Sequence, residues 1–379
     1  MRVAFNGTAL LSPWAGVGQY TGQLAAELVR SEAIEPEFFY GFGWSTQVRS
    51  APMPGAGRWF PLARRWVPFS YSLRRAFQNG RFRRHTRRSH FDLYHEPNFL
   101  PLDFDGPTVV TVHDLSWMRF PETHPPERVR ALNRDFQRGL LRADRVITDS
   151  EHVRRELIDT FGLPGSRIRA IPLAAGAIFK PVEADAAASR LAGYGLRPGS
   201  FFLSVGTLEP RKNLPRVVEA YRSLPDSLQS RLPLVLVGST GWSPGALEKA
   251  LQPLVASGRV RRLGYLPGQD LALVTASALA LVYPSLYEGF GLPPLEAMQC
   301  GVPAIVSADS SMSEVTGHAA LQIDPLDPGD IAAAMLRLAE DPPLRRGLGD
   351  AARARAATFS WRRCADETIE VYRNLVVRP

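Results

Sequence analysis

Short apolar runs alternate with helical stretches along most of this 379-residue chain. Strand-like runs include "RVAFNG" and "TVVTVHDL", and the first of them leads to "YTGQLAAELVR", which has helical spacing. The alternation begins again with "SFFLSVGTL" and continues as far as "VPAIVS". Strands that alternate with helices form parallel sheets with helices on both faces. The pattern therefore predicts an α/β chain built from two doubly wound, Rossmann-like domains.

A break near residues 175–200 separates the two series, and a chain of 379 residues is too long for one typical core. We place an N-terminal domain at residues 1–178 and a C-terminal domain at 179–358. Residues 359–379 include the amphipathic stretch "WRRCADETIEVYRNLV", which predicts a final helix that packs back towards the N-terminal domain. Open parallel sheets bind ligands at the carboxyl ends of their strands, so we expect the active site in a central cleft that the two domains face.

The composition narrows the class of protein. A net charge of +8 suggests anionic partners, such as phosphorylated metabolites, nucleic acid or an acidic membrane surface. The two cysteines, Cys300 and Cys364, are too few for a disulfide framework and favour a reducing cytoplasm. The N-terminus does not read as a signal peptide, and the longest apolar run, about 13 residues, is shorter than the ~20 that span a bilayer. We expect a cytoplasmic protein that is soluble or peripherally attached to a membrane.

Two carboxylates stand eight positions apart in "YEGFGLPPLE", residues 287–296, directly after a predicted strand. Gly289 and Gly291 allow a backbone to approach a ligand closely, and the start of the following helix favours an anion. Glu288 and Glu296 would repel phosphate, but each can accept two hydrogen bonds from a vicinal diol. The stretch predicts a site for sugar hydroxyls beside a diphosphate. The alternative is a capped helix in which Glu296 only supports the helix dipole.

A pair of adjacent cations follows another predicted strand, in "GTLEPRKNL" at residues 206–214. Arg211 can grip two phosphate oxygens, and Lys212 supplies a point charge. Each charge-assisted hydrogen bond contributes ~1.5–3 kcal/mol. The pair predicts a diphosphate site, and a solvated surface pair is the alternative.

The first half of the chain carries two weaker signals. Gly16 and Gly18 end a long loop before the first predicted helix, where backbone N–H groups could face an anion, although the loop could also be a plain connector. His113 ends a buried strand, where its imidazole could bond a substrate hydroxyl or orient a leaving group, or serve a structural role. The triplet "DFD" at Asp103–Asp105 has the form of an Asp-x-Asp metal site but precedes a Gly-Pro turn, so we expect no metal there.

Residues 58–88 contain ten arginines, several aromatic residues and no acid. Basic and aromatic side chains together suit an anionic membrane surface, where each basic residue contributes ~1 kcal/mol. They would also suit RNA, or form an ordinary pair of partly buried helices. We rank peripheral membrane contact above nucleic acid, which is not an expected partner.

The motifs together resemble those of glycosyltransferase family 4, whose members are retaining enzymes of the GT-B fold. "EGFGLPPLEAMQCGVPAIVS" resembles the Glu-x7-Glu signature of the family, and "VGTLEPRKNL" resembles its phosphate-contact motif. "VITDSEHVRREL" and "IPLAAGAIFKP" are similar to landmarks between these motifs. The resemblance runs nearly end to end and implies two Rossmann-like domains that bind a nucleotide sugar. The residues Ser12, Pro13 and Trp14 depart from any fixed family pattern, which leaves the acceptor contacts open.

The resemblance also implies roles for particular residues. Glu288 should contact hydroxyls of the donor sugar and Glu296 the ribose diol, while Arg211 and Lys212 hold the diphosphate. His113 corresponds to the active-site histidine near the sugar. The expected catalytic residues are thus His113, Arg211, Lys212 and Glu288. Besides Glu296, the expected donor-binding residues are Gly16, Gly18, Leu266, Gly289, Phe290, Gly291 and Leu292.

Two shorter motifs, "HEPNFLPL" and "TVHDLSWMRFPE", resemble mannosyltransferases of bacterial O-antigen and exopolysaccharide assembly. This narrower resemblance implies transfer of a hexosyl group, with GDP-mannose as the first choice of donor, to a glycan or a polyprenyl-diphosphate-linked saccharide. It implies no metal and no cofactor beyond the donor substrate. A UDP- or dTDP-sugar donor, a GT-B epimerase, and a non-catalytic binder of anionic lipid or nucleic acid are the alternatives.

Overall fold

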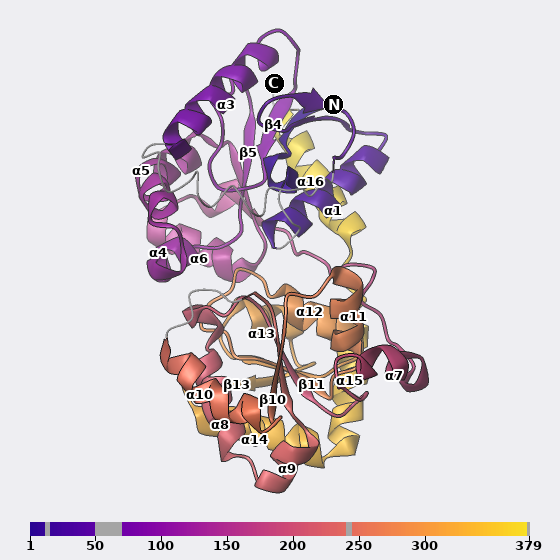
Figure 1. The fold of residues 1–379 in the computed structure, drawn as a ribbon. Coiled ribbons are helices and arrows are strands. Elements are labelled where there is room, and N and C mark those ends of the chain that lie inside the picture. The colour runs from indigo at the N-terminus through magenta and orange to yellow at the C-terminus, as the bar shows by residue number, and fades with distance from the viewer. Residues whose placement is uncertain (12–15, 50–69, 240–244, 377–379) are drawn as a thin grey trace. The chain divides into compact units, whose positions relative to one another are not determined.

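The computed structural model describes residues 1–11, 16–49, 70–239 and 245–376, and in it the chain divides into two compact units (Figure 1). Unit 1 comprises Met1–Leu173 together with Trp361–Pro379, and unit 2 comprises Ala174–Ser360. The sequence pattern predicts instead that the N-terminal domain ends at residue 178 and the C-terminal domain at residue 358. Each unit holds one predominantly or wholly parallel sheet, so the predicted α/β class with two doubly wound sheets is confirmed.

Unit 1 contains a seven-stranded sheet with the order β3-β2-β1-β4-β5-β6-β7. All neighbours are parallel except β2 and β3, which are antiparallel. The strands are β1 (Arg2–Asn6), β2 (Glu35–Phe39), β3 (Trp44–Ser45), β4 (Leu93–Glu96), β5 (Thr108–Val112), β6 (Arg145–Thr148) and β7 (Ile168–Ala170). The α-helices are α1 (Val17–Arg30), α3 (Ser70–Thr86), α4 (Ser116–Arg119), α5 (Pro126–Arg142), α6 (Glu151–Phe161) and α16 (Trp361–Val376). Short 3-10 helices are η1 (Thr8–Leu11), η2 (Pro121–Thr123) and η3 (Gly165–Arg167).

Unit 2 contains a six-stranded parallel sheet with the order β10-β9-β8-β11-β12-β13. The strands are β8 (Phe202–Val205), β9 (Leu234–Val237), β10 (Val260–Gly264), β11 (Ala280–Tyr283), β12 (Ala304–Ser307) and β13 (Leu321–Ile323). The helices are α7 (Ala184–Ala192), η4 (Pro210–Lys212), α8 (Leu214–Ser223), α9 (Asp226–Arg231), α10 (Gly245–Ala256), α11 (Gly268–Ala276), α12 (Leu292–Gln299), α13 (Ser311–Thr316), α14 (Pro328–Glu340) and α15 (Pro342–Ala356).

The strand order of unit 2 explains where its loops meet. From β8 the chain builds β9 and β10 outwards on one side and then returns to place β11 on the other side of β8. Such a reversal opens a crevice at the carboxyl ends of the two central strands, where ligands bind in open α/β sheets. The loops that follow β8 and β11 therefore emerge side by side. In unit 1, β1 and β4 form the corresponding pair.

Successive residues of the strands in unit 2 belong to two different apolar cores. Ala280 and Val282 pack in a core with residues of α8 and α14, whereas Leu281 and Tyr283 pack in a core with residues of α7, α11 and α12. Side chains of a strand point alternately to the two faces of the sheet. Both faces of this sheet are thus covered by helices, which explains why its strands read as continuous apolar runs.

The last helix of the chain, α16, packs against α1 within unit 1 (Figure 1). The hydroxyl of Tyr372 on α16 lies 2.6 Å from His95 Nδ1, and His95 Nε2 lies 2.8 Å from Thr111 Oγ1. Tyr20 of α1 reaches the same Thr111 hydroxyl at 2.9 Å. Burial lowers the pKa of His95 to about 3, so its imidazole is neutral. One ring nitrogen therefore donates to a hydroxyl, and the other accepts from a hydroxyl.

Two features of the sequence analysis fall partly outside this description. Ser12, Pro13 and Trp14 lie outside the described residues, as do residues 58–69 of the arginine-rich stretch. The remainder of that stretch, from residue 70 onwards, includes helix α3. No helix in the described parts of the chain is long and apolar enough to cross a bilayer.

Replacement of Tyr372 by phenylalanine tests the role of α16 in unit 1. The substitution leaves His95 buried with one nitrogen that has lost its partner, which costs about 1–3 kcal/mol of unfolding free energy. Tyr265→Phe is the matched control, because it removes the same hydroxyl from a side chain that is 67% exposed. Urea unfolding followed by circular dichroism should show destabilisation by Y372F alone. Equal stability of the two variants would contradict the buried network.

Candidate functional site

The two loops at the switch point of unit 2 are tied to each other by backbone and side-chain bonds. The N–H of Leu286, after β11, donates to the carbonyl of Arg211, after β8, at 2.7 Å. Asn213 is buried in the left-handed region (φ 60°) and donates from Nδ2 to the Pro284 carbonyl at 3.0 Å. An asparagine tolerates this backbone conformation better than most residues. The loops therefore present their side chains in a fixed arrangement.

Glu288 lies between the two predicted phosphate-binding cations. Its Oε1 accepts from Lys212 Nζ at 2.5 Å, and its Oε2 accepts from Arg211 at 2.8 Å. The hydroxyl of Tyr283, the last residue of β11, donates to Oε1 at 2.8 Å. Arg211 is paired on its other side with Glu209, whose carboxylate lies 2.6 Å from Nε. The structure thus brings Arg211, Lys212 and Glu288 together, as members of one buried charge cluster.

The charges of this cluster stabilise one another. Burial would raise the pKa of Glu288, but the charges of Lys212 and Arg211 outweigh it and lower this pKa to about 2. The same burial lowers the pKa of Lys212 and raises that of Tyr283 well above its ordinary value. Glu288 is therefore ionised at neutral pH. Two carboxylates balance the two cations, so an anionic ligand at Arg211 and Lys212 must share them with Glu288 and Glu209.

The position of Glu288 refines its expected role. Only 8% of the residue is exposed, and its oxygens already accept from Lys212, Tyr283 and Arg211. A carboxylate offers about four lone-pair positions, so at least one remains for a further donor. Its first effect is to orient the cations, and a contact with sugar hydroxyls stays a prediction.

The glycine-rich segment joins this cluster to helix α12. Gly291 immediately precedes the helix with φ 108°, and a Cβ atom at this position would lie 2.9 Å from the side chain of Met312. The carbonyl of Glu288 accepts from Ser311 Oγ at 2.7 Å, and Phe290 packs edge-on against Phe359. The segment Gly289–Leu292 is thus anchored from both sides. The positive end of α12 adjoins the charge cluster through this segment.

The other donor-site residues predicted in unit 2 lie on neighbouring elements. Glu296 belongs to α12, lies eight residues after Glu288 in the sequence, and is 7% exposed. Leu266 follows β10, which is two strands from β8 in the sheet. Both residues lie after the carboxyl ends of strands, where the sequence analysis placed the donor. Their contacts with a nucleotide stay predictions.

His113, in unit 1, is held by two acceptors. Its Nδ1 lies 2.7 Å from a carboxylate oxygen of Asp149, and its Nε2 lies 2.8 Å from the carbonyl of Pro97. Both partners present acceptor oxygens, an arrangement that favours an imidazole with a proton on each ring nitrogen. Burial lowers its pKa, but the charge and hydrogen bond of Asp149 outweigh burial and raise the pKa of His113 above its ordinary value. The raised pKa favours the charged form of His113, and both of its ring nitrogens are engaged by Asp149 and Pro97.

The glycines predicted near the donor in unit 1 occupy the start of α1. Gly16 precedes the helix with φ 52°, and a Cβ atom there would meet no atom of the described residues within 4 Å. Gly18 lies inside the first turn and is buried. Gly16 therefore leaves open space beside the backbone, as close approach to a ligand requires.

Sequence reasoning missed three members of these clusters and left one motif to be explained. Glu209 stands two residues before Arg211, whereas Tyr283 stands 71 residues after Lys212, and only the fold shows that each of them contacts the predicted cations. Asp149 is 36 residues from His113, and adjacency of β5 and β6 brings the two together. In the "DFD" triplet, Asp103 accepts from Arg142 at 2.6 Å and Asp105 from Arg87 at 2.9 Å, so each carboxylate already has a cationic partner.

Replacement of Glu288 by glutamine should destabilise unit 2 in a pH-dependent way. The pKa of Glu288 is about 2 in the folded protein against an ordinary 4.5, so the stabilisation by its charge is complete above pH 4.5 and is lost as the pH falls through 2. The shift corresponds to about 3 kcal/mol. Urea unfolding should show this difference between wild type and E288Q at pH 7 and convergence of the two in acid.

Glu340→Gln is the control for this experiment, because it removes a carboxylate from an exposed position of the same unit. It should leave the pH dependence unchanged. A stability of E288Q equal to that of wild type at pH 7 would rule out the stabilising role of the cluster.

Comparison with known proteins follows the division into units. Residues 14–174 match the family model described as "Glycosyltransferase Family 4", and residues 197–355 match "Glycosyl transferases group 1". The chain is 34% identical over 383 aligned positions to O-antigen chain mannosyltransferase B of Escherichia coli, with 99% of this chain and all of that protein covered. It is 35% identical to the serotype-specific mannosyltransferase WbdA of Escherichia coli over 71% of this chain and 34% of that protein.

The fold is also similar to that of solved glycosyltransferases. Sucrose-phosphate synthase from Thermosynechococcus elongatus superposes with a TM-score of 0.76 at 21% identity, and the match covers 99% of each chain. This likeness concerns the fold, whereas the identity to mannosyltransferase B over the full length concerns the family. The protein therefore belongs to glycosyltransferase family 4 and is a glycosyltransferase of the GT-B fold.

Proposed function

We propose that this glycosyltransferase moves a mannosyl group, with retention of configuration, from a nucleotide sugar to a saccharide acceptor in the synthesis of a surface polysaccharide. The observation that carries the proposal is the pair of partly buried cations, Arg211 and Lys212, at the switch point of unit 2. The choice of mannose rests on the relatives, since the full-length match is to a protein named as an O-antigen chain mannosyltransferase. GDP-mannose is accordingly the proposed donor.

The cation pair suits the diphosphate of such a donor. The planar guanidinium of Arg211 matches two phosphate oxygens, and the ammonium of Lys212 adds a compact charge. The positive end of α12 favours the same anion. Glu296 would accept the two ribose hydroxyls, and the remaining lone pair of Glu288 would accept a hydroxyl of the sugar.

In the proposed reaction, departure of the nucleoside diphosphate breaks the bond between the anomeric carbon and the β-phosphate oxygen. Negative charge develops on that oxygen, where Arg211, Lys212 and the start of α12 stabilise it. The acceptor hydroxyl attacks the same face of the oxocarbenium-like sugar and gives its proton to the leaving phosphate. The family resemblance assigns His113 to the active site, and its contacts with Asp149 and Pro97 favour a role as a charge over a role as a base.

The proposed acceptor is a glycan or a saccharide linked to polyprenyl diphosphate. An acceptor with a lipid anchor requires the enzyme to work at the inner face of the cytoplasmic membrane. The arginines of residues 58–88 support this location, because basic side chains are attracted to anionic lipid. We therefore place the enzyme in the cytoplasm, peripherally attached to that membrane.

A panel of nucleotides tests the donor. GDP, UDP and dTDP should be added separately, and the melting temperature of the protein measured for each. A ligand present at about 100 times its dissociation constant raises the free energy of unfolding by ~2.7 kcal/mol. GDP should produce the largest shift. A larger shift with UDP or dTDP would refute GDP-mannose, and the lack of any shift would refute nucleotide-sugar binding.

Replacement of Lys212 by alanine tests the mechanism. Loss of one group that stabilises developing charge costs ~2.7–4 kcal/mol of transition-state stabilisation, so turnover should fall about a hundredfold or more. Lys249→Ala is the matched control, because Lys249 is exposed on α10 and should leave turnover unchanged. Turnover can be followed as nucleotide release that depends on a saccharide acceptor. Near wild-type turnover of K212A would overturn the assignment.

A further inference from the structure

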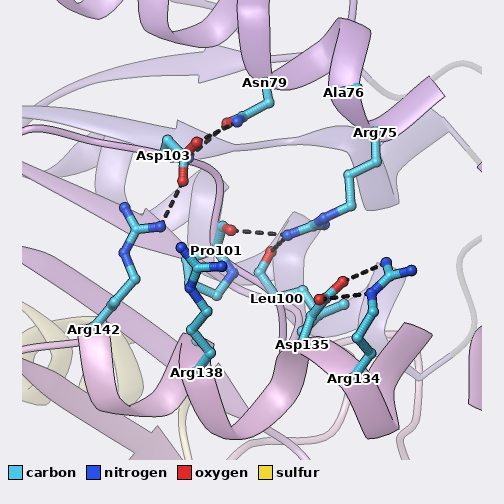
Figure 2. A pocket seen from close by; sticks show the side chains of 11 residues that line it. Arg75, Ala76, Asn79, Leu100, Pro101, Asp103, Arg134, Asp135, Arg138 and Arg142 are labelled. Atoms are coloured by element: carbon cyan, nitrogen blue, oxygen red, sulfur yellow. Dashed lines mark hydrogen bonds and ion pairs between the residues drawn. The ribbon is translucent and has the colours of Figure 1, made fainter. Parts of the chain in front are cut away.

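Unit 1 contains a second concentration of positive charge, in a pocket between α3 and α5 (Figure 2). The pocket has a volume of about 290 Å³. The chain at Leu100 and Pro101 forms part of its wall, and arginines from both helices reach into it. The pocket shares no residue with the groups proposed to bind the donor, which raises the question of what it binds.

The wall of the pocket is held in place by Arg75 of α3. The guanidinium of Arg75 donates to the carbonyls of Leu100 at 3.2 Å and Pro101 at 2.9 Å, as Figure 2 shows. On the opposite side α5 comes close to the same segment, because a Cβ atom at Gly139 would lie 3.0 Å from the Pro101 ring. These contacts fix the spacing of the two helices around the pocket.

Two of the four arginines that line the pocket are already neutralised. Arg134 donates to both carboxylate oxygens of Asp135 at 2.9 and 2.7 Å, and Arg142 donates to Asp103 at 2.6 Å. Asp103 also accepts from Asn79, at 2.5 Å. Both acidic side chains of the pocket wall are thus already paired with arginines.

The other two arginines keep their charge. Among the described residues, no carboxylate lies within 4 Å of Arg75, which donates to backbone carbonyls, or of Arg138, which is exposed. Figure 2 shows the Arg138 side chain rising from α5 towards Pro101, with no bond to the other residues drawn. Four arginines and two aspartates give the lining a net charge of +2. The guanidinium N–H groups of Arg138 can therefore donate hydrogen bonds to an external anion.

The surroundings of the pocket fit an anion that is carried by a lipid. Arg130, Arg134, Arg138 and Arg142 recur every four residues and so lie along one face of α5. A large apolar side chain is exposed next to them on the same helix, because Leu141 adjoins Arg142 in the sequence and is 62% exposed. Basic residues beside exposed apolar residues are typical of contact with an anionic membrane surface.

We infer that this pocket binds a phosphate group carried by a membrane lipid, with Arg138 as the principal contact and Arg75 as a second charge. The guanidinium of Arg138 can form two parallel hydrogen bonds to phosphate oxygens. The phosphate could belong to a phospholipid head group or to a polyprenyl diphosphate, since both present the same oxygens. The inference needs neither the proposed donor nor the proposed reaction.

Binding to vesicles, measured by flotation without any nucleotide sugar, tests this inference. Three compositions are compared: phosphatidylcholine alone, phosphatidylcholine with phosphatidylglycerol, and phosphatidylcholine with undecaprenyl diphosphate. Arg138→Ala is the test variant, and Arg130→Ala is the matched control, because it removes the same charge from an exposed position of the same helix that does not line the pocket. Because the assay involves no turnover, its failure would leave the proposed glycosyl transfer untouched.

Loss of a charge-assisted hydrogen bond in R138A should lower the affinity for phosphate-bearing vesicles roughly 10- to 100-fold. Loss of only a nearby charge in R130A should lower it about fivefold. Arg138→Lys should recover less than half of the lost binding on a logarithmic scale, because lysine lacks the planar fork. Binding of the wild-type protein to undecaprenyl diphosphate vesicles alone would identify the acceptor lipid as the source of the phosphate. Binding to both kinds of anionic vesicle would identify phosphate head groups in general.

Three results would overturn the inference. Equal losses in R138A and R130A would mean that only the overall charge of the helix matters. Thermal stabilisation by inorganic pyrophosphate without vesicle binding would assign the pocket to a soluble phosphate. Binding of an RNA oligonucleotide that R138A abolishes, with vesicles unbound, would assign the arginines to nucleic acid.

Discussion

The contact of Glu288 with Lys212 and Arg211 holds the candidate donor site together. Two adjacent cations withdrawn from water repel each other and lose hydration, and an ionised carboxylate between them offsets both costs. Because Glu288 follows β11 and the cations follow β8, the same contact joins the two loops on which the site is built. The Glu288 side chain thus contributes both to the charge balance of this unit and to the geometry of its two loops.

The two sheets share a winding pattern but differ in the chemistry at their switch points. In unit 1 the strands β1 and β4 end at Asn6 and Glu96, whose side chains lie 2.7 Å apart, and Tyr94 donates to the same carboxyl at 2.5 Å. Burial raises the pKa of Glu96 to about 7, because no cation contacts it among the described residues. The two switch points therefore differ in charge because of the residues that follow the strands and not because of the winding.

The sequence predicted the two parallel sheets correctly and located the loops after β8 and β11, because both depend on local patterns. Apolar runs of strand length, the glycines before α12 and the adjacent Arg211 and Lys212 can all be read within a few residues. The contacts that define the chemistry could not be read in this way. Asp149 meets His113 only because β5 pairs with β6. The two groups that raise the pKa of this histidine by hydrogen bonding include a backbone carbonyl, which no side-chain pattern reveals. The contacts of Glu288 with Arg211 and Lys212 could not be read for the same reason, since the cations follow β8 and Glu288 follows β11.

The return of the chain to unit 1 through α16 makes that unit discontinuous in sequence. Domains fold as units while a chain is being synthesised from its N-terminus. Unit 2, which is continuous from Ala174 to Ser360, can complete its core before the last helix has left the ribosome, whereas unit 1 must wait with the surface of α1 uncovered. The stretch that begins the protein is thus the last to become fully folded. A premature stop near the C-terminus would therefore damage the unit that was made first, while the donor loops could still form.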